Sequence, residues 1–107
     1  MTPVLSYQKI LPKQFLALQN QHPNLVLFDV RTQEEYEMGR LPDAKLLPIQ
    51  WMPYVLSQVC PDKNLTYVLY CRSGSRSQDA ARYMIEQGYH QVYDLGGILD
   101  WPYDIIK

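Results

Sequence analysis

One segment of the chain combines a cysteine, small residues and arginines in a spacing that suits chemistry at sulfur. Cys71 follows the apolar run 67–70 and precedes a short loop, after which a helical pattern begins at Arg76. A cysteine between a strand end and a helix start lies where backbone N–H groups converge and the helix dipole is positive. Both effects favour a thiolate over a thiol, and both favour a bound anion. We therefore predict that Cys71 is a nucleophilic or sulfur-carrying residue in an anion-binding loop.

The loop after this cysteine has residues that suit such a site. Gly74 allows a backbone conformation in which successive N–H groups point inward. Ser75 or Ser77 is expected to cap the following helix, whose N-terminus adds positive charge. We expect the backbone of the whole loop to stabilise a sulfur anion; its residues are Arg72, Ser73, Gly74, Ser75, Arg76 and Ser77.

Arg72 and Arg76 are the fixed charges of this loop. If either side chain faces the site, its paired N–H donors can hold an anionic donor; solvent-exposed positions are the alternative for both. Only four residues separate Cys71 from Arg76, so the ring should fit a sulfur better than a tetrahedral phosphate. The loop also lacks a general acid that could protonate a leaving alkoxide. The spacing therefore favours sulfur chemistry over phosphatase-like chemistry.

Simpler structural interpretations exist for several of these residues. Cys71 could be a small buried hydrophobic residue, although the glycine, arginines and helix start beside it favour a reactive one. Cys60 precedes a proline at a helix end and is interpreted as an incidental thiol, with a resolving role as the alternative. Asp29 and Arg31 stand at a strand end, which is often a functional edge in parallel sheets. We instead expect structural pairing, for example of Arg31 with Glu35.

The composition limits the functions that are open. The chain has 107 residues, 47% hydrophobic and 20% charged, with a net charge of −1, so a single domain over residues 1–107 is expected. This charge gives no general attraction to nucleic acid or membranes, and no transmembrane segment or secretory signal is predicted. Two cysteines are too few for a disulfide framework. A reducing, cytoplasmic compartment and a monomer are the simplest expectations.

Strand-like and helix-like patterns alternate along the chain. The nearly continuous apolar run 25–30 is typical of a strand buried on both faces of a parallel sheet. Thr32 and Glu35 match a capping box, and Gly39 is suited to end that short helix. Further strands are predicted at 4–7, 44–47, 67–70 and 92–95, and further helices at 12–19, 50–59 and 76–87. This order predicts an α/β fold with a central, mostly parallel sheet flanked by helices.

Three segments together resemble the signatures of rhodanese domains and come in that family's order. The first comprises Asp29-Val-Arg31, Glu35-Tyr36, the stretch 39–44 and Pro48-Ile49. The second is the loop 71–77, and the third is Leu95-Gly-Gly-Ile98 with Trp101. Two positions depart from the family's pattern, which usually has histidine at Arg40 and glycine at Asp43. Both lie in the first signature, so they bear on a turn or a partner-binding surface more than on the cysteine.

The resemblance implies a rhodanese-like domain in which Cys71 carries sulfane sulfur as a persulfide. It implies a small anionic donor such as thiosulfate, which Arg72 and Arg76 would steer, and an acceptor such as cyanide or a thiol. A sulfur-carrier or thioredoxin-like protein is a further candidate partner. No metal or organic cofactor is required, because the transferred sulfur is the working group. A catalytically silent interaction module remains an alternative, and a phosphatase-like or arsenate-reductase-like enzyme is a less favoured one.

Overall fold

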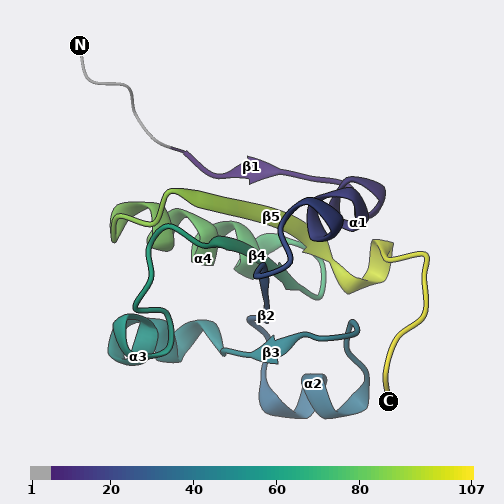
Figure 1. Ribbon diagram of the computed structural model, residues 1–107. Helices are drawn as coiled ribbons and strands as arrows, with labels where there is room; N and C mark the ends of the chain where they lie inside the picture. The colour runs from purple at the N-terminus through teal and green to yellow at the C-terminus, as the bar shows by residue number, and fades with distance from the viewer. Residues whose placement is uncertain (1–5) are drawn as a thin grey trace.

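The apolar runs of the sequence form a five-stranded parallel sheet in the computed structural model, which describes residues 6–107 (Figure 1). The strands are β1 (Gln8–Lys9), β2 (Val26–Asp29), β3 (Lys45–Leu46), β4 (Thr66–Cys71) and β5 (Gln91–Gly97). They are arranged in the order β1-β5-β4-β2-β3, and every neighbouring pair is parallel. The central strand β4 is buried along its whole length, which explains its almost continuously apolar sequence.

The helices that cover this sheet begin at residues with local start signals. The helix α1 (Pro12–Gln21) has a proline in its first turn, where the missing N–H would have no intrahelical acceptor. The helix α2 (Gln33–Met38) begins after Thr32, whose Oγ1 accepts from the Glu35 N–H at 3.2 Å. The Glu35 carboxylate accepts in return from the Thr32 N–H, so the predicted capping box is confirmed. The remaining helices are α3 (Met52–Val59) and α4 (Ser75–Glu86), with short 3-10 turns η1 (Ile49–Trp51) and η2 (Ile98–Asp100).

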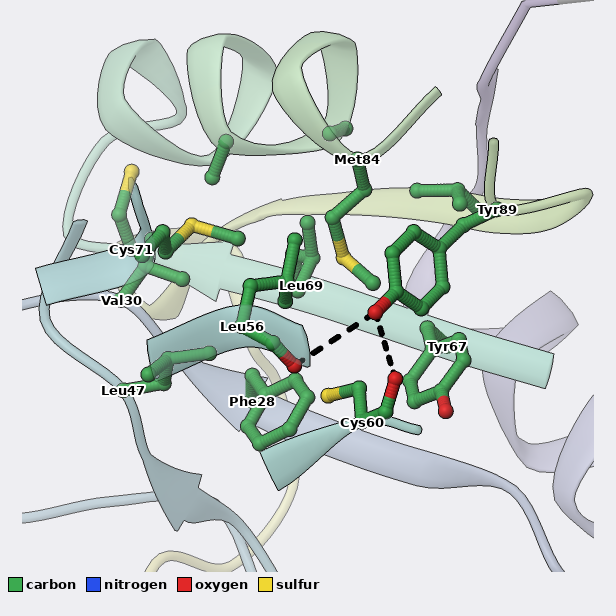
Figure 2. Close-up of a cluster of buried hydrophobic side chains, with 14 residues drawn as sticks. Phe28, Val30, Leu47, Leu56, Cys60, Tyr67, Leu69, Cys71, Met84 and Tyr89 are labelled. Atoms are coloured by element: carbon green, nitrogen blue, oxygen red, sulfur yellow. Dashed lines mark hydrogen bonds between the residues drawn. The ribbon is translucent and has the colours of Figure 1, made fainter. Parts of the chain in front are cut away.

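Two apolar clusters lie on opposite faces of the sheet, because side chains alternate along each strand. On β4, Leu69 and Cys71 belong to the cluster that includes Met84 of α4 (Figure 2). The residue between Leu69 and Cys71, Tyr70, belongs to the other cluster, together with Phe15 of α1. Cys71 therefore ends the central strand on the face that α4 covers.

The predicted α/β class with a parallel sheet is confirmed, and one strand lies later than expected. The edge strand predicted at 4–7 is instead Gln8–Lys9, which pairs with β5. Val4 and Leu5 lie outside the described residues. Within residues 6–107, no helix has the length and apolar character needed to cross a bilayer.

The start of α4 differs from the prediction in its cap. The helix begins at Ser75, and its N-cap is Gly74, without a hydrogen bond from a capping side chain. The expected cap by Ser75 or Ser77 is wrong for two reasons. Ser75 is already the first helical residue, and the Ser77 hydroxyl donates toward β5 rather than accepting from the first turn.

Candidate active site at the end of the central strand

Cys71 ends β4 with its sulfur enclosed by the following loop. The residue is fully buried, and the backbone N–H of Gly74 donates to its Sγ at 3.0 Å. Gly74 has a φ of +108°, a left-handed conformation that glycine adopts without steric cost. The first N–H groups of α4 lie in the same turn and have no intrahelical acceptor. The expected approach of a backbone donor to the sulfur is therefore present at Gly74.

Close backbone contact holds this loop against the end of β5. A Cβ at Gly97 would overlap the carbonyl oxygen of Arg72 and come within 2.7 Å of the Ser73 Cα. The N–H of Leu99 also donates to the Arg72 carbonyl, at 3.3 Å. Glycine is required at position 97 because no side chain fits there, and its absence of a side chain lets β5 set the path of the loop.

Ser77, in the first turn of α4, joins the sulfur to a buried carboxylate. The Cys71 thiol donates to Ser77 Oγ at 3.6 Å, and the Ser77 hydroxyl donates to Asp94 Oδ1 at 2.7 Å. Asp94 lies on β5 and is 4% exposed. Sequence reasoning included Ser77 in the loop but missed Asp94. The available signal was a carboxylate inside the apolar run 92–95, because a buried charge requires polar partners.

Arg76 extends from the first turn of α4 to Glu35 at the start of α2. Its Nη1 and Nη2 donate to the two carboxylate oxygens of Glu35 at 2.7 and 3.0 Å. These hydrogen bonds lower the pKa of Glu35 to about 2, although burial acts in the opposite direction, and they raise the pKa of Arg76. The sequence assigned Glu35 to the capping box, which it completes, and to a pairing with Arg31. The salt bridge was missed because it joins residues far apart in the chain.

The remaining loop residues, Arg72, Ser73 and Ser75, are exposed and border two hollows. Arg72 lines a cavity of about 420 Å³ whose apolar wall includes Met38 and Leu99. Ser73 and Ser75 line a second cavity of about 470 Å³, together with the ends of β1 and β5. Of the six predicted loop residues, Gly74 and Ser77 contact the sulfur of Cys71, Arg76 binds Glu35, and Arg72, Ser73 and Ser75 border the two cavities.

Asp29 and Arg31 bind each other at the end of β2. Arg31 donates to Asp29 from Nη2 at 2.6 Å and from Nε at 2.9 Å, and the Tyr70 hydroxyl donates to the same carboxylate at 2.7 Å. The expected structural pairing is therefore confirmed. The suggested partner was wrong, because Glu35 is bound by α4 and Arg31 is satisfied by Asp29.

A family profile covers almost all of this arrangement. The profile described as Rhodanese-like domain matches residues 11–103. The chain belongs to the rhodanese-like domain family. The resemblance drawn from the three sequence segments is thereby confirmed, and the match includes the cysteine loop and the residues that surround it.

Relatives of this rhodanese-like domain include a protein named for sulfur transfer. The protein named Sulfurtransferase from Allochromatium vinosum is 42% identical over 79 residues, which cover 73% of this chain and 72% of that one. A rhodanese-like domain protein from Staphylococcus aureus has a TM-score of 0.76 at 29% identity, covering 91% of this chain and 93% of that one. A rhodanese with anions from E. coli has a TM-score of 0.68 at 28% identity, with 78% and 98% covered. These relatives support sulfur transfer as the class of reaction.

The two positions that depart from the family pattern, Asp43 and Arg40, lie in one turn of this rhodanese-like domain. Asp43 has a φ of +65°, a left-handed conformation that aspartate adopts more readily than most residues. Arg40 lies over the ring of Tyr36, with its Cζ 4.7 Å from the ring centroid. Its backbone N–H donates to the Ile106 carbonyl at 2.9 Å. Asp43 therefore occupies a left-handed position in the turn, and the backbone of Arg40, independently of its side chain, pairs with the C-terminal segment.

Cys60 lies in the same apolar cluster as Cys71 but in a different part of it (Figure 2). It follows α3 and is 1% exposed, and burial raises the pKa of its thiol to about 11. The Tyr89 hydroxyl donates to its carbonyl oxygen. A buried and protonated thiol is a poor resolving nucleophile, so the geometry favours the incidental interpretation.

Proposed function

We propose that this domain transfers sulfane sulfur from a small anionic donor such as thiosulfate to cyanide or a thiol, through a persulfide on Cys71. The observation that supports this most strongly is the hydrogen bond from the Gly74 N–H to Sγ at 3.0 Å, at the start of α4. Backbone N–H groups and a helix N-terminus stabilise an anion without transferring a proton to it. A persulfide that must remain nucleophilic requires this kind of support.

Two displacements at sulfur complete the proposed reaction. The Cys71 thiolate attacks the outer sulfur of thiosulfate; a new S–S bond forms, and sulfite leaves with the electron pair of the broken bond. Cyanide then attacks the terminal sulfur of the persulfide, which produces thiocyanate and returns the thiolate. A thiol acceptor would accept the same sulfur and become a persulfide itself. The electrons balance within these steps, so no external oxidant or reductant takes part.

The two arginines have different parts in this proposal. Both terminal nitrogens of Arg76 are bound by Glu35, so we assign Arg76 mainly to holding the loop. Arg72 is exposed and lines the 420 Å³ cavity, and no side-chain hydrogen bond is found for it within residues 6–107. We therefore assign Arg72 to attracting the anionic donor. The apolar wall beside it suits a thiol on a larger carrier, such as a sulfur-carrier or thioredoxin-like protein.

The intact mass of the reduced protein after incubation with thiosulfate tests this function. The wild type should gain the mass of one sulfur atom and lose it again with cyanide. Cys71→Ser should gain none and should keep its folded far-UV circular dichroism spectrum. Cys60→Ser is the matched control and should gain sulfur like the wild type, because Cys60 is buried and its thiol is held protonated.

The same measurement discriminates between the alternatives. A sulfur gain that persists in Cys71→Ser would contradict the assignment of the nucleophile. No gain in a wild type whose Cys71 thiol is shown to be free would favour an interaction module, and a defined partner complex would be the next observation to seek. Turnover of an aryl phosphate with inhibition by vanadate would favour phosphatase-like chemistry instead.

A further inference from the structure

A buried carboxylate behind Cys71 has no part in the displacements at sulfur. The Asp94 Oδ1 accepts from the Ser77 hydroxyl at 2.7 Å and from the Gly96 N–H at 2.9 Å. Ser77 Oγ accepts in turn from the Cys71 thiol at 3.6 Å. The thiol, the hydroxyl and the carboxylate thus form a continuous hydrogen-bonded chain. Because its members come from β4, α4 and β5, the arrangement is fixed by the fold and not by one flexible segment.

The direction of the Ser77 hydroxyl decides whether these hydrogen bonds favour the thiol or the thiolate of Cys71. Its single hydrogen has other acceptors within reach, the carbonyl oxygens of Gly74 and Gly96 at 3.2 and 3.3 Å. Asp94 is nearer and charged, and charge-assisted hydrogen bonds are the stronger ones. The hydrogen therefore points at Asp94, and a lone pair of Oγ faces the sulfur. In this orientation Ser77 can accept from S–H but cannot donate to a thiolate.

We propose that Asp94 is a positioning residue that acts through the Ser77 hydroxyl to hold the resting Cys71 in its thiol form. A carboxylate two hydrogen bonds from the sulfur disfavours a second negative charge there. When the Cys71 thiol gives its proton to solvent, the Ser77 hydroxyl turns from Asp94 to the sulfur and donates to the thiolate. Susceptibility of a cysteine to oxidation follows its thiolate character, so the same arrangement protects Cys71 between turnovers. The role in turnover rests on the proposed function, whereas the effect on ionisation does not.

The other charged groups near these hydrogen-bonded residues act differently from Asp94. Near Cys71, the Arg76 guanidinium and the Gly74 N–H favour the thiolate, while Glu35 partly balances Arg76. Near Asp94, two groups line the same 470 Å³ cavity, Lys9 of β1 and Asp100 of η2. The remaining charges at this edge of the sheet are exposed Arg72 and the internally paired Asp29 and Arg31. Asp94 is therefore the negative group, among the described residues, that reaches the sulfur through hydrogen bonds.

Nuclear magnetic resonance of protein labelled with ¹³C at the cysteine Cβ tests the proposal. The chain has two cysteines, and the pKa of Cys60 is raised to about 11 by burial, so Cys60 serves as an internal reference. Asp94→Asn keeps the side-chain shape and removes the charge. It should lower the titration midpoint of Cys71 by about one pH unit, a tenfold rise in its ionisation constant. Asp100→Asn removes a charge from the same cavity without a contact to Ser77, and should leave the midpoint unchanged.

An unchanged or higher midpoint in Asp94→Asn overturns the proposal. If that variant does not fold, the wild type still decides the question, because the coupling is reciprocal. The carboxyl ¹³C resonance of Asp94 should then shift with the same midpoint as Cys71. An Asp94 resonance whose chemical shift does not change as Cys71 ionises also overturns the proposal. Neither measurement requires turnover. The mass experiment with thiosulfate therefore tests the proposed function separately.

Discussion

At the scale of single residues, the two loop arginines differ in a way that has a kinetic consequence: Arg76 binds Glu35, whereas Arg72 has no side-chain partner within residues 6–107. Arg72→Ala removes the exposed cation beside the 420 Å³ cavity, and we expect the KM for thiosulfate to rise about tenfold, roughly 1.4 kcal/mol, with little change in stability. Arg82→Ala is the matched control, because Arg82 is an exposed arginine of α4 that binds Asp79. Steady-state kinetics at low and high salt check this, and an unchanged KM in Arg72→Ala would remove that residue from donor binding.

The position of Cys71 between a strand end and a helix start could be predicted from sequence, and two of the residues around it could not. Cys71 is marked by local features alone, a strand end, a glycine and a helix start. Glu35 and Asp94 reach the loop only because the helix α2 and the strand β5 lie beside it in the folded domain. Their contacts depend on strand order, and no periodicity within a single segment encodes that order. Arg31 shows the same limit, since its pairing was expected but its partner was not.

At the scale of elements, the end of β5 determines the path of the cysteine loop. A methyl group at position 97 would overlap the Arg72 carbonyl oxygen and press on Ser73, so Gly97→Ala should displace the loop from its present position. We expect sulfur transfer to fall by more than tenfold while the protein remains folded, because the contact lies at the carboxyl end of the strand β5 and not in the middle of the sheet. Gly88→Ala provides a comparison for backbone strain alone: its φ is +93°, so it should lose stability, but the atoms nearest to its new Cβ belong to the flexible Lys63 side chain, so the cysteine loop should keep its position. Equal activity losses in the two variants would contradict this account.

The salt bridge between α2 and α4 predicts a dependence of stability on pH. The Arg76 guanidinium lowers the pKa of Glu35 to about 2 from an ordinary value near 4.5. A carboxylate with a lowered folded-state pKa stabilises the fold above its unfolded pKa, and this contribution is lost as the pH falls from about 4.5 toward 2. Glu35→Gln should therefore show a shallower loss of stability across this window. At pH 7 it should be less stable by about 1 kcal/mol or less, because the pair is partly exposed.

Urea unfolding of the wild type and Glu35→Gln between pH 7 and 3 measures this difference. Glu34→Gln is the control, because Glu34 is an exposed neighbour in the same helix and forms no ion pair within the described residues. The control should follow the wild type at every pH. If Glu35→Gln also loses stability in parallel with the wild type, the salt bridge does not contribute as the structure indicates.

Element boundaries were predictable where the chain carries its own start signal. Thr32 and Glu35 cap α2 through contacts three residues apart, and Pro12 begins α1. The cap of α4 was not predictable in the same way. Ser77 has the residue type of a helix cap, but its hydroxyl binds Asp94 on another element. The turn is made instead by Gly74, whose conformation becomes necessary only when the loop folds over the sulfur of Cys71.

At the scale of the whole molecule, one sheet separates two apolar clusters and should make them unfold together. Leu69 is fully buried in the cluster under α3 and α4, and Leu41 is 1% exposed in the cluster on the other face. Replacing either leucine by alanine leaves a cavity and should cost about 2–5 kcal/mol. Leu99→Ala, at an exposed position, should cost less than about 0.5 kcal/mol.

The decisive observation is whether different probes of unfolding agree in these variants. Trp101 packs on Phe15 of α1, with ring centroids 6.0 Å apart, so in a Trp51→Phe background tryptophan fluorescence reports on the cluster that contains Leu41. Far-UV circular dichroism reports on all helices and strands. Because both clusters share every central strand, we expect the two probes to give coincident transitions in Leu41→Ala and in Leu69→Ala. A fluorescence transition that precedes the circular dichroism transition in Leu41→Ala alone would mean that one face opens independently, and the sheet would then not couple the site to the opposite cluster.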